Sequence, residues 1–164
     1  MVIEGSHKIP ISRDIVWDAL SDPDTLRSCI PGCASFVEKA ENEYAATIRA
    51  SVGPVSSAFS INIVLSEMKP PKSYKITGRG KGAGTAGFAQ GSATLVLVEH
   101  GTETELHYTA DTKVGGKLAQ VGSRLIEVAA YKLADGFFTN LVRHLEPGKA
   151  VEKDDNKTSS GYYI

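Results

Sequence analysis

The order of two hydrophobic patterns along the chain limits the fold more than any other feature of this sequence. From Ala34 to Val114, apolar and polar residues alternate in successive segments that short turns separate, and a period of two is typical of strands with one buried face. From Lys117 to about Leu145, apolar residues recur at a helical spacing instead. Consecutive strands joined by short turns form an antiparallel meander, whose apolar face must be covered. We therefore predict an α+β fold in which a curved antiparallel sheet of about seven strands wraps around a long C-terminal helix.

The residues before this meander predict one more strand and two short helices. Val2–Ile9 alternates in polarity as a half-buried strand does. Ser12 is a suitable N-cap for a helix over Arg13–Leu20. Asp22-Pro23 then begins a second short helix, which is expected to end near Cys29 because Pro and Gly follow it.

The meander itself divides into six strands at turn residues such as Gly, Pro and Asn. The stretch Lys81–Gly87 is rich in Gly and Ala, and it predicts a flexible lip rather than a continuous strand. The strands are expected at Ser35–Lys39, Glu43–Val52, Val55–Met68, Lys72–Lys81, Gly91–Val98 and Glu103–Val114.

The long helix is predicted to be a single element that presents one apolar stripe to the sheet. Polar positions, among them Glu127, Tyr131 and Asp135, are expected on the opposite side. Pro147-Gly148 ends the helix, so residues 1–146 form the predicted domain and residues 147–164 a polar C-terminal tail. The stripe consists of Leu118, Val121, Leu125, Ala129, Leu133, Phe137 and Leu141.

Composition and charge exclude several classes of protein. The chain has 164 residues, of which 41% are hydrophobic, and a formal net charge of −1. A length of this order suits one domain, and the charge gives no basic footprint for nucleic acid. No apolar run approaches the roughly 20 residues that cross a bilayer, and the first ten residues lack the apolar core of a signal peptide. We expect a cytoplasmic protein with no nucleic-acid partner.

The sequence brings together no set of residues that would carry catalysis or hold a metal. Cys29 and Cys33 form one C-x3-C pair with no further Cys or His nearby, so they are expected to be small packing residues rather than zinc ligands. The four histidines are scattered, and His7, on the apolar side of its strand, is expected to be a core residue. We predict no catalytic residues, no metal site and no enzyme activity.

Small residues in the middle of the expected interface between sheet and helix predict a cavity. Glycines recur from Gly78 to Gly91, and Gly115, Gly116 and Gly122 lie around the helix start. Small side chains on both sides leave a gap that favours an apolar ligand. The alternative is that these glycines only permit strong curvature of the sheet. The predicted lining consists of Phe59, Phe88, Tyr108, Leu118, Val121, Gly122 and Leu125.

Several stretches resemble one known family. They are Asp22-Pro23, Cys29-Ile30-Pro31-Gly32-Cys33, Val52-Gly53-Pro54-Val55, Ala86-Gly87-Phe88-Ala89 and the string from Gly115 to Ile126. Over about residues 1 to 146 the chain resembles the CoxG family of carbon monoxide dehydrogenase subunits, which is part of the START-like (SRPBCC) superfamily. The resemblance implies a helix-grip fold with a hydrophobic cavity.

The same resemblance implies a function. The chain would be a non-catalytic accessory protein of a carbon monoxide dehydrogenase-type molybdenum hydroxylase, would bind a respiratory quinone such as menaquinone or ubiquinone, and would help couple the enzyme to the cytoplasmic face of the membrane. No covalent cofactor is implied. The tail is short, and only Tyr162, Tyr163 and Ile164 could touch lipid, which allows at most weak peripheral contact.

Two other functions remain open at this stage. The chain could be a protein–protein adaptor or maturation factor that docks on the dehydrogenase, with an incidental cavity. It could also be a small-molecule cyclase or hydrolase like some members of the wider superfamily. An enzyme would need a polar group inside the cavity, and the inward candidates are His7, Tyr74 and Tyr108.

Overall fold

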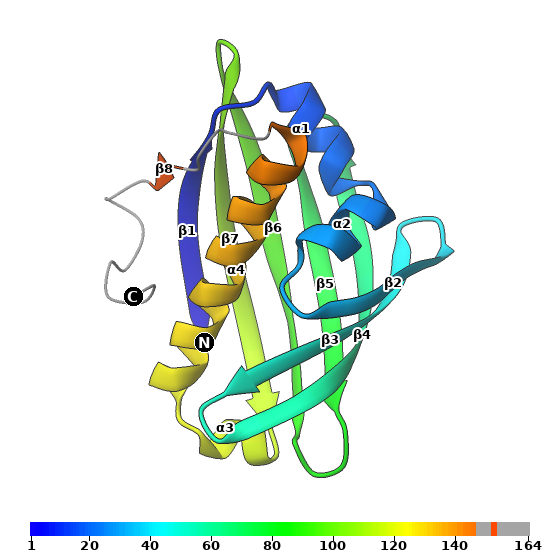
Figure 1. Cartoon of the computed structure of the whole chain (residues 1–164), viewed down its shortest axis with the longest axis vertical. Coiled ribbons are helices and arrows are strands. Elements are labelled where there is room, and N and C mark those ends of the chain that lie inside the picture. Colours follow the sequence, from blue (N-terminus) through cyan, green and yellow to red (C-terminus); the bar gives the residue numbers. More distant parts are fainter. Residues whose placement is uncertain (147–151, 154–164) are drawn as a thin grey trace.

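An antiparallel sheet forms most of the computed structural model, which describes residues 1–146 and 152–153. Its strands in the described residues are β1 (Val2–Ile9), β2 (Cys33–Ala40), β3 (Glu43–Val52), β4 (Val55–Lys69), β5 (Ser73–Gly82), β6 (Phe88–His100), β7 (Glu103–Gly115) and β8 (Glu152–Lys153). Their order across the sheet is β2-β3-β4-β5-β6-β7-β1-β8. The strands β2 to β7 therefore follow one another as the predicted meander, and β1 adds beside β7 (Figure 1).

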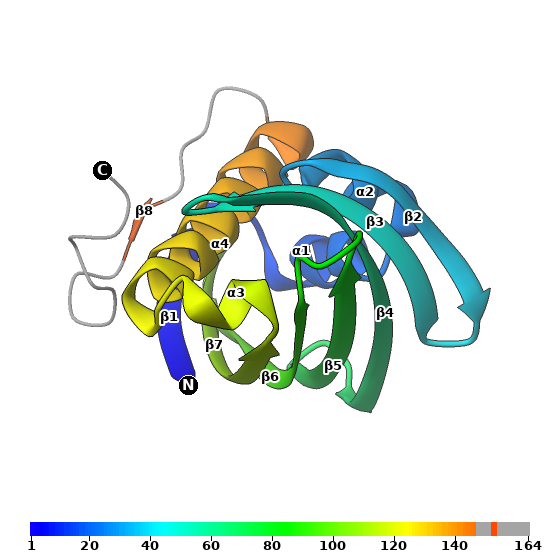
Figure 2. The same cartoon turned by 90° about the horizontal axis from the view of Figure 1, so that it is seen from below.

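Four helices in the described part of the chain accompany this sheet. They are α1 (Arg13–Leu20), α2 (Pro23–Cys29), α3 (Lys117–Gln120) and α4 (Ser123–Leu145). The sheet curves strongly, and α4 lies across the open side of the curve, as Figure 2 shows. The carboxylate of Asp22 caps α2, because it accepts hydrogen bonds from the Thr25 N–H at 3.3 Å and the Thr25 hydroxyl at 2.6 Å. The predicted α+β, START-like helix-grip fold is confirmed.

The predicted strands are correct in number and order up to β7, but some of their ends are not. Strands β2 and β6 are longer than predicted at both ends. Residues Ala83–Gly87 form a turn between β5 and β6 rather than strand, as the Gly-rich composition indicated. The predicted tail, residues 147–164, lies outside the described residues apart from Glu152 and Lys153, which pair with Lys8 and His7 of β1.

The prediction of one continuous C-terminal helix is wrong. The chain leaves helical geometry at Gly122, whose φ is +101°, and α3 and α4 are separate elements on either side of it. A side chain at this φ would be strained, whereas glycine adopts it readily. Hydrophobic periodicity does not reveal such a break, because it continues across the one glycine.

The predicted buried face of α4 is also wrong along most of its length. Residues spaced by four advance about 40° around a helix at each step, so the predicted stripe drifts by about 160° between Leu125 and Leu141. Leu125 and Leu133 are 46% and 41% exposed, whereas Leu141 is fully buried. The buried side chains of α4 are Tyr131, Phe138, Leu141 and Val142.

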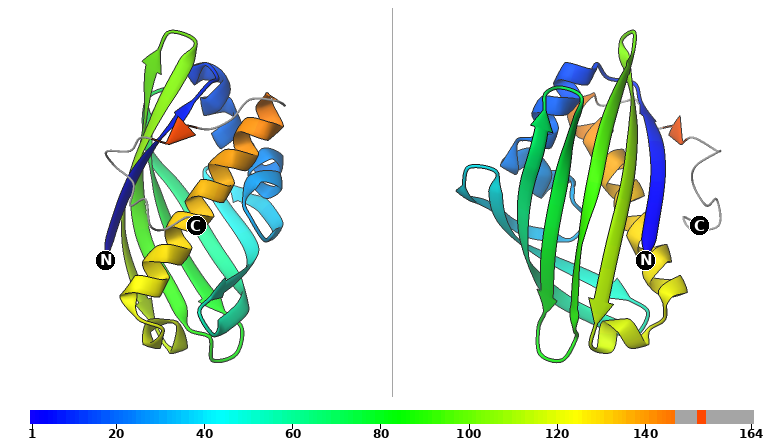
Figure 3. Two further views of the ribbon diagram at one scale, coloured as in Figure 1. Left: turned by 60° about the vertical axis from the view of Figure 1, so that its left-hand side comes forward. Right: turned by 180° about the vertical axis from the view of Figure 1, so that it is seen from behind.

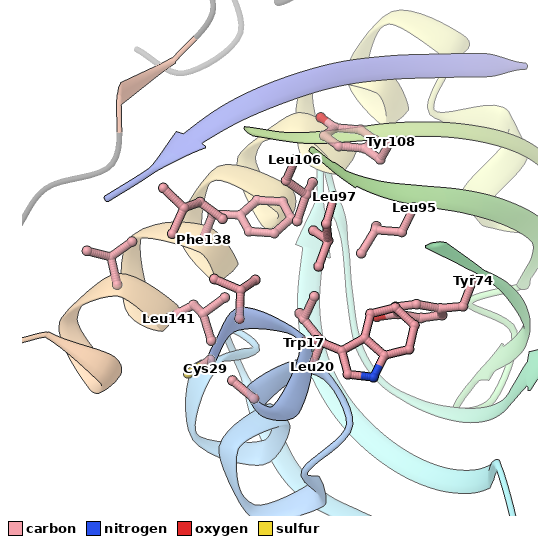
Figure 4. Packing of buried hydrophobic residues seen from close by; sticks show 14 of the residues in the cluster. Trp17, Leu20, Cys29, Tyr74, Leu95, Leu97, Leu106, Tyr108, Phe138 and Leu141 are labelled. Atoms are coloured by element: carbon pink, nitrogen blue, oxygen red, sulfur yellow. The ribbon is translucent and has the colours of Figure 1, made fainter. Parts of the chain in front are cut away.

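Hydrogen bonds from two side chains of α4 to the backbone of other elements hold the helix in this orientation. The Tyr131 hydroxyl, predicted to face water, donates to the carbonyl oxygen of Glu4 at 2.9 Å and accepts from its N–H at 3.2 Å. Near the other end of α4, the Asn140 side-chain amide donates to the carbonyl oxygen of Cys29 at 2.9 Å. Side chains of α1, α2, α4 and the sheet converge in the core between these two anchors (Figure 4).

The difference between Leu141 and Leu133 gives a test of the observed helix face. Substitution Leu141→Ala removes a fully buried side chain, so we expect a loss of about 2–5 kcal/mol in the free energy of unfolding. Substitution Leu133→Ala makes the same chemical change at a 41% exposed position, and we expect a loss of about 1 kcal/mol or less. Urea denaturation followed by circular dichroism measures both, and equal losses would contradict this orientation of α4.

Candidate ligand-binding site

One half of the inner face of the sheet is tightly filled. Leu95 of β6 lies between Tyr74 of β5 and Tyr108 of β7 in a single cross-strand row, and all three side chains are buried. Trp17 of α1 packs edge-on against the Tyr74 ring, with centroids 5.3 Å apart. The next row contains the buried Leu97 and Leu106. This end of the space between sheet and helices is therefore closed, and Trp17 is a core residue.

The middle of the inner face is thinly covered. The next row, towards α3, contains Ile76, Ala93 and Ala110, and all three are only half-buried although they point inward. In the following row Ile63 is half-buried too, and it pairs with Gly78. A Cβ placed on Gly78 would meet no atom within 4 Å. Space therefore lies above Gly78, bordered by apolar side chains.

Most of the other glycines do not contribute to this space. A Cβ on Gly80 would lie only 3.1 Å from the Ile61 side chain, and one on Gly82 would lie 2.7 Å from Ala86 and 2.9 Å from Phe59. Other glycines allow backbones to approach: a Cβ on Gly91 would lie 2.2 Å from the Asp111 carbonyl oxygen. The prediction of a broad gap along all the glycines is therefore too large, and the alternative of curvature and close approach holds for most of them.

The end of the space opposite Tyr108 is bordered by α3 and two turns. The buried Leu118 of α3 donates its N–H to the carbonyl oxygen of Ala86, at 2.9 Å, in the turn between β5 and β6. The turn between β3 and β4 touches the start of α4, because a Cβ on Gly53 would meet Val121 at 3.0 Å and Leu125 at 3.3 Å. Segments far apart in the sequence thus meet at this end of the molecule (Figure 2).

The structure divides the predicted site residues into three groups: residues on the inner side, residues at the junction of α3 and α4, and one residue on the outer face of the sheet. Phe59, Tyr108 and Leu118 are buried on the inner side, and Val121 is half-buried beside Gly53. Gly122 and Leu125 lie at the exposed junction of α3 and α4.

Phe88 lies on the other side of the sheet. It pairs with Lys81 and Gly115, and its ring covers Gly115. The expectation that Phe88 points into the cavity is wrong, because the register of β6 turns it outward. Sequence reasoning missed the inner positions Ile61, Ile63, Ile76 and Gly78 as a group, although period-two alternation placed each of them on the inner side.

Polar groups also lie inside the fold. His7 is fully buried, and its Nε2 lies 3.7 Å from Oδ1 of Asp135 on α4. Asp135 was predicted to face water, and the drift of the helical stripe explains that error. The His7 ring packs against Phe138, with centroids 4.5 Å apart. His7 is thus a core histidine, as expected, with a carboxylate beside it.

The Tyr108 hydroxyl is buried and has no hydrogen-bond partner among the described residues. Burial raises the pKa of Tyr108 well above its ordinary value, and the nearby Tyr131 and Asp135 raise it further. The phenol therefore keeps its proton and can donate it in a hydrogen bond. An unpaired buried donor is costly to a fold, so this hydroxyl is a natural contact point for an acceptor.

The cysteines occupy packing positions. Cys29 is buried in the core, and Cys33 is half-buried with its thiol donating to the Ser35 carbonyl oxygen at 3.2 Å. Burial raises the pKa of both thiols, which disfavours the reactive thiolate. The described residues hold no group of three His, Cys, Asp or Glu side chains placed to share a metal ion. No helix among them is both long enough and apolar enough to cross a membrane.

Two glycines of β5 give a test of the space. Both Gly78 and Gly80 face inward, but only Gly80 has a side chain, Ile61, against its Cβ position. We expect Gly80→Ile to lower the free energy of unfolding by about 1–3 kcal/mol because it overpacks the site. We expect Gly78→Ile to leave it unchanged or to raise it by up to about 1 kcal/mol. Urea denaturation of the two variants measures this, and a large loss for Gly78→Ile would disprove the space.

Similar solved structures share this fold. A conserved protein from Geobacillus kaustophilus is 29% identical, with a TM-score of 0.84 over 93% of this chain and 99% of that one. A START superfamily protein from Mycobacterium smegmatis is 12% identical, with a TM-score of 0.68 over 88% of this chain and 97% of that one. The ZhuI aromatase/cyclase from Streptomyces sp. R1128 is also 12% identical, with a TM-score of 0.64 over 89% and 93% of the two chains.

The sequence itself matches one protein family over most of its length. A comparison with curated proteins gave no match. The family match covers residues 5–146, which include every strand from β2 to β7, all four helices and most of β1. The chain therefore belongs to the CoxG family of carbon monoxide dehydrogenase subunits.

Proposed function

We propose that this chain is a non-catalytic accessory protein of a carbon monoxide dehydrogenase-type molybdenum hydroxylase, and that it carries an apolar small molecule, a respiratory quinone, between its sheet and α4. The observation that supports the proposal most is the space above Gly78, which half-buried apolar residues border on the inner face. Membership in the CoxG family supports the role beside such an enzyme.

The character of the lining favours an apolar ligand of the quinone kind. Ile63, Ile76 and Ala110 offer no hydrogen bonds, and apolar cavities favour apolar ligands over water. The hydroxyl of Tyr108 lies against Gly5 of β1, at the edge of this interior, and it can donate to an acceptor there. A quinone combines an apolar ring and chain with two carbonyl acceptors, so it suits this combination. The lining retained from the sequence prediction is Phe59, Tyr108, Leu118 and Val121, to which we add Ile61, Ile63, Ile76 and Gly78.

The position of the His7–Asp135 pair supports a non-catalytic role. His7 pairs with Leu106, whereas Tyr108 belongs to the next row towards the space. The Tyr108 ring therefore separates His7 from Ala110 and from the ligand position. A general base must reach the atom it deprotonates, and this pair is enclosed by the core instead.

The proposed role needs exchange of the ligand with a bilayer. A protein that shuttles a quinone must meet the cytoplasmic face of the membrane only briefly, and weak peripheral contact is sufficient for that. The side chain of Leu125 is exposed beside the turn at Gly53, and that of Leu133 is exposed about two turns further along α4. They are the surface of the described chain that we propose for this contact.

Quinone binding is tested with a matched pair of variants on β5. The purified chain, stripped of lipid, is incubated with menaquinone and observed by native mass spectrometry and by thermal unfolding. We expect a one-to-one complex and a raised Tm. Gly78→Ile fills the space and should weaken binding at least tenfold, whereas Thr77→Ile, on the outer face of the same strand, should bind as the unchanged chain does.

Two results would contradict the proposal. One is the absence of any quinone complex together with an unchanged Tm. The other is equal binding by Gly78→Ile and Thr77→Ile, which would place the ligand elsewhere. Lipid extraction of the chain purified from a quinone-containing host, followed by mass spectrometry, is an independent check on which apolar molecule it holds.

A further inference from the structure

The outer face of the sheet, opposite the proposed ligand site, is hollowed. A hollow of about 910 Å³ lies across β4, β5, β6 and β7, and a second of about 490 Å³ lies beside it towards the turn between β5 and β6. Both are lined by Arg79 and Gln90, so the two hollows adjoin at this pair of residues. We call the two hollows together the outer trough. Figure 3 shows the strands that form it in its right-hand view.

Cross-strand pairing places a row of polar side chains along the floor of the outer trough. Asn62 of β4, Arg79 of β5, Gln90 of β6 and Lys113 of β7 follow one another in register. Lys81 and Phe88 form a pair two residues further along their strands. The row is built by four strands in fixed register, so the spacing of its charges is fixed by the sheet.

The lining of the outer trough is positive, although the whole chain has a formal net charge of −1. The cations that line it are Lys75, Arg79, Lys81 and Lys113, against one carboxylate, that of Asp111. Within the described part of the chain, Lys75 forms an ion pair with Glu67, and Arg79, Lys81 and Lys113 form none. Three positive charges are therefore held together outside any ion pair, because the carboxylate of Asp111 lies 3.6 Å from the Met1 ammonium instead, and this favours an anionic partner.

Two further features favour a protein over a membrane as that partner. The outer trough is concave, so a protruding segment fits it better than a flat bilayer does; a helix, about 10–12 Å across, is such a segment. An exposed aromatic residue, Phe88, 39% accessible, lies in the trough beside these cations. Aromatic and Arg side chains are enriched among the residues that dominate protein–protein binding.

We propose that the outer trough is the docking site for a protein partner that presents an acidic, protruding segment. Because this proposal rests on the proposed function for the identity of the partner, the partner to be tested is the carbon monoxide dehydrogenase-type hydroxylase from the same organism. The trough and the space above Gly78 lie on opposite faces of β5. A partner in the trough therefore leaves the ligand side uncovered, and cargo binding and docking are separable.

The test uses two double variants with the same change in net charge. Arg79→Glu with Lys113→Glu reverses two charges in the outer trough. Lys39→Glu with Lys72→Glu reverses two exposed charges elsewhere. Binding of each full-length variant to the purified hydroxylase is measured by biolayer interferometry at 50 mM and 300 mM salt, and circular dichroism confirms folding.

We expect the unchanged chain to bind, and its affinity to fall as salt rises. The trough variant should lose at least tenfold in affinity, and the control variant should stay within about threefold. Quinone binding should be the same in all three proteins, because the ligand lies on the other face. A failure of quinone binding would thus concern the proposed function and not the trough.

Three results would overturn the docking site. In the first, the unchanged chain does not bind the hydroxylase. In the second, the trough and control variants lose affinity equally, which indicates only a long-range effect of net charge. In the third, the trough variant loses binding to vesicles of phosphatidylcholine and phosphatidylglycerol but keeps its affinity for the hydroxylase, which assigns the trough to a membrane instead.

Discussion

The antiparallel register that runs from Phe59–Ser66 of β4 through β5 and β6 to β7 is the constraint on which the rest of the structure depends. It aligns side chains in rows across four strands, so one row can be bulky and the next small. The row of Tyr74, Leu95 and Tyr108 closes one end of the interior, and two rows further along the strands Ile63 and Gly78 leave space. On the outer face the same register gathers Arg79 and Lys113 with the amides of Asn62 and Gln90. Both proposed sites are products of one pairing scheme.

The strands could be predicted from the sequence because a period of two assigns each residue to a face without reference to the rest of the chain. That local rule located Tyr74, Tyr108 and Phe59 correctly on the inner side. It could not be applied to Phe88, because the predicted strand began only at Gly91 and left Phe88 outside any strand. The helix was harder to predict, since several stripes fit a long apolar segment and packing selects one of them. Hydrogen bonds between Tyr131 and the backbone of Glu4, which are far apart in the sequence, fix that choice, and no local pattern encodes them.

The site could be predicted only in outline for a related reason. A glycine marks a position without a side chain, but the sequence does not say whether empty space, another side chain or another backbone segment lies next to it. Gly78, Gly80 and Gly91 lie on the same face of adjacent strands, and each has a different neighbour. The stretch from Gly115 to Ile126 indicated the family but not the local geometry, because it contains Gly122, where the predicted helix breaks. The Asp135 carboxylate beside His7 was missed for the same reason as the face of α4.

The hydrogen bonds between the Tyr131 hydroxyl and the Glu4 backbone also affect how this protein avoids association with itself. In the described part of the chain, the two residues of β8 lie beside β1 at His7 and Lys8. Within the described residues, the remainder of β1 forms an edge of the sheet. Unpaired N–H and C=O groups on such an edge can recruit a strand from another molecule. The Tyr131 hydroxyl occupies both backbone groups of Glu4 near the middle of that edge. One phenol on the last long helix therefore serves as a guard against aggregation through β1, in addition to orienting the helix.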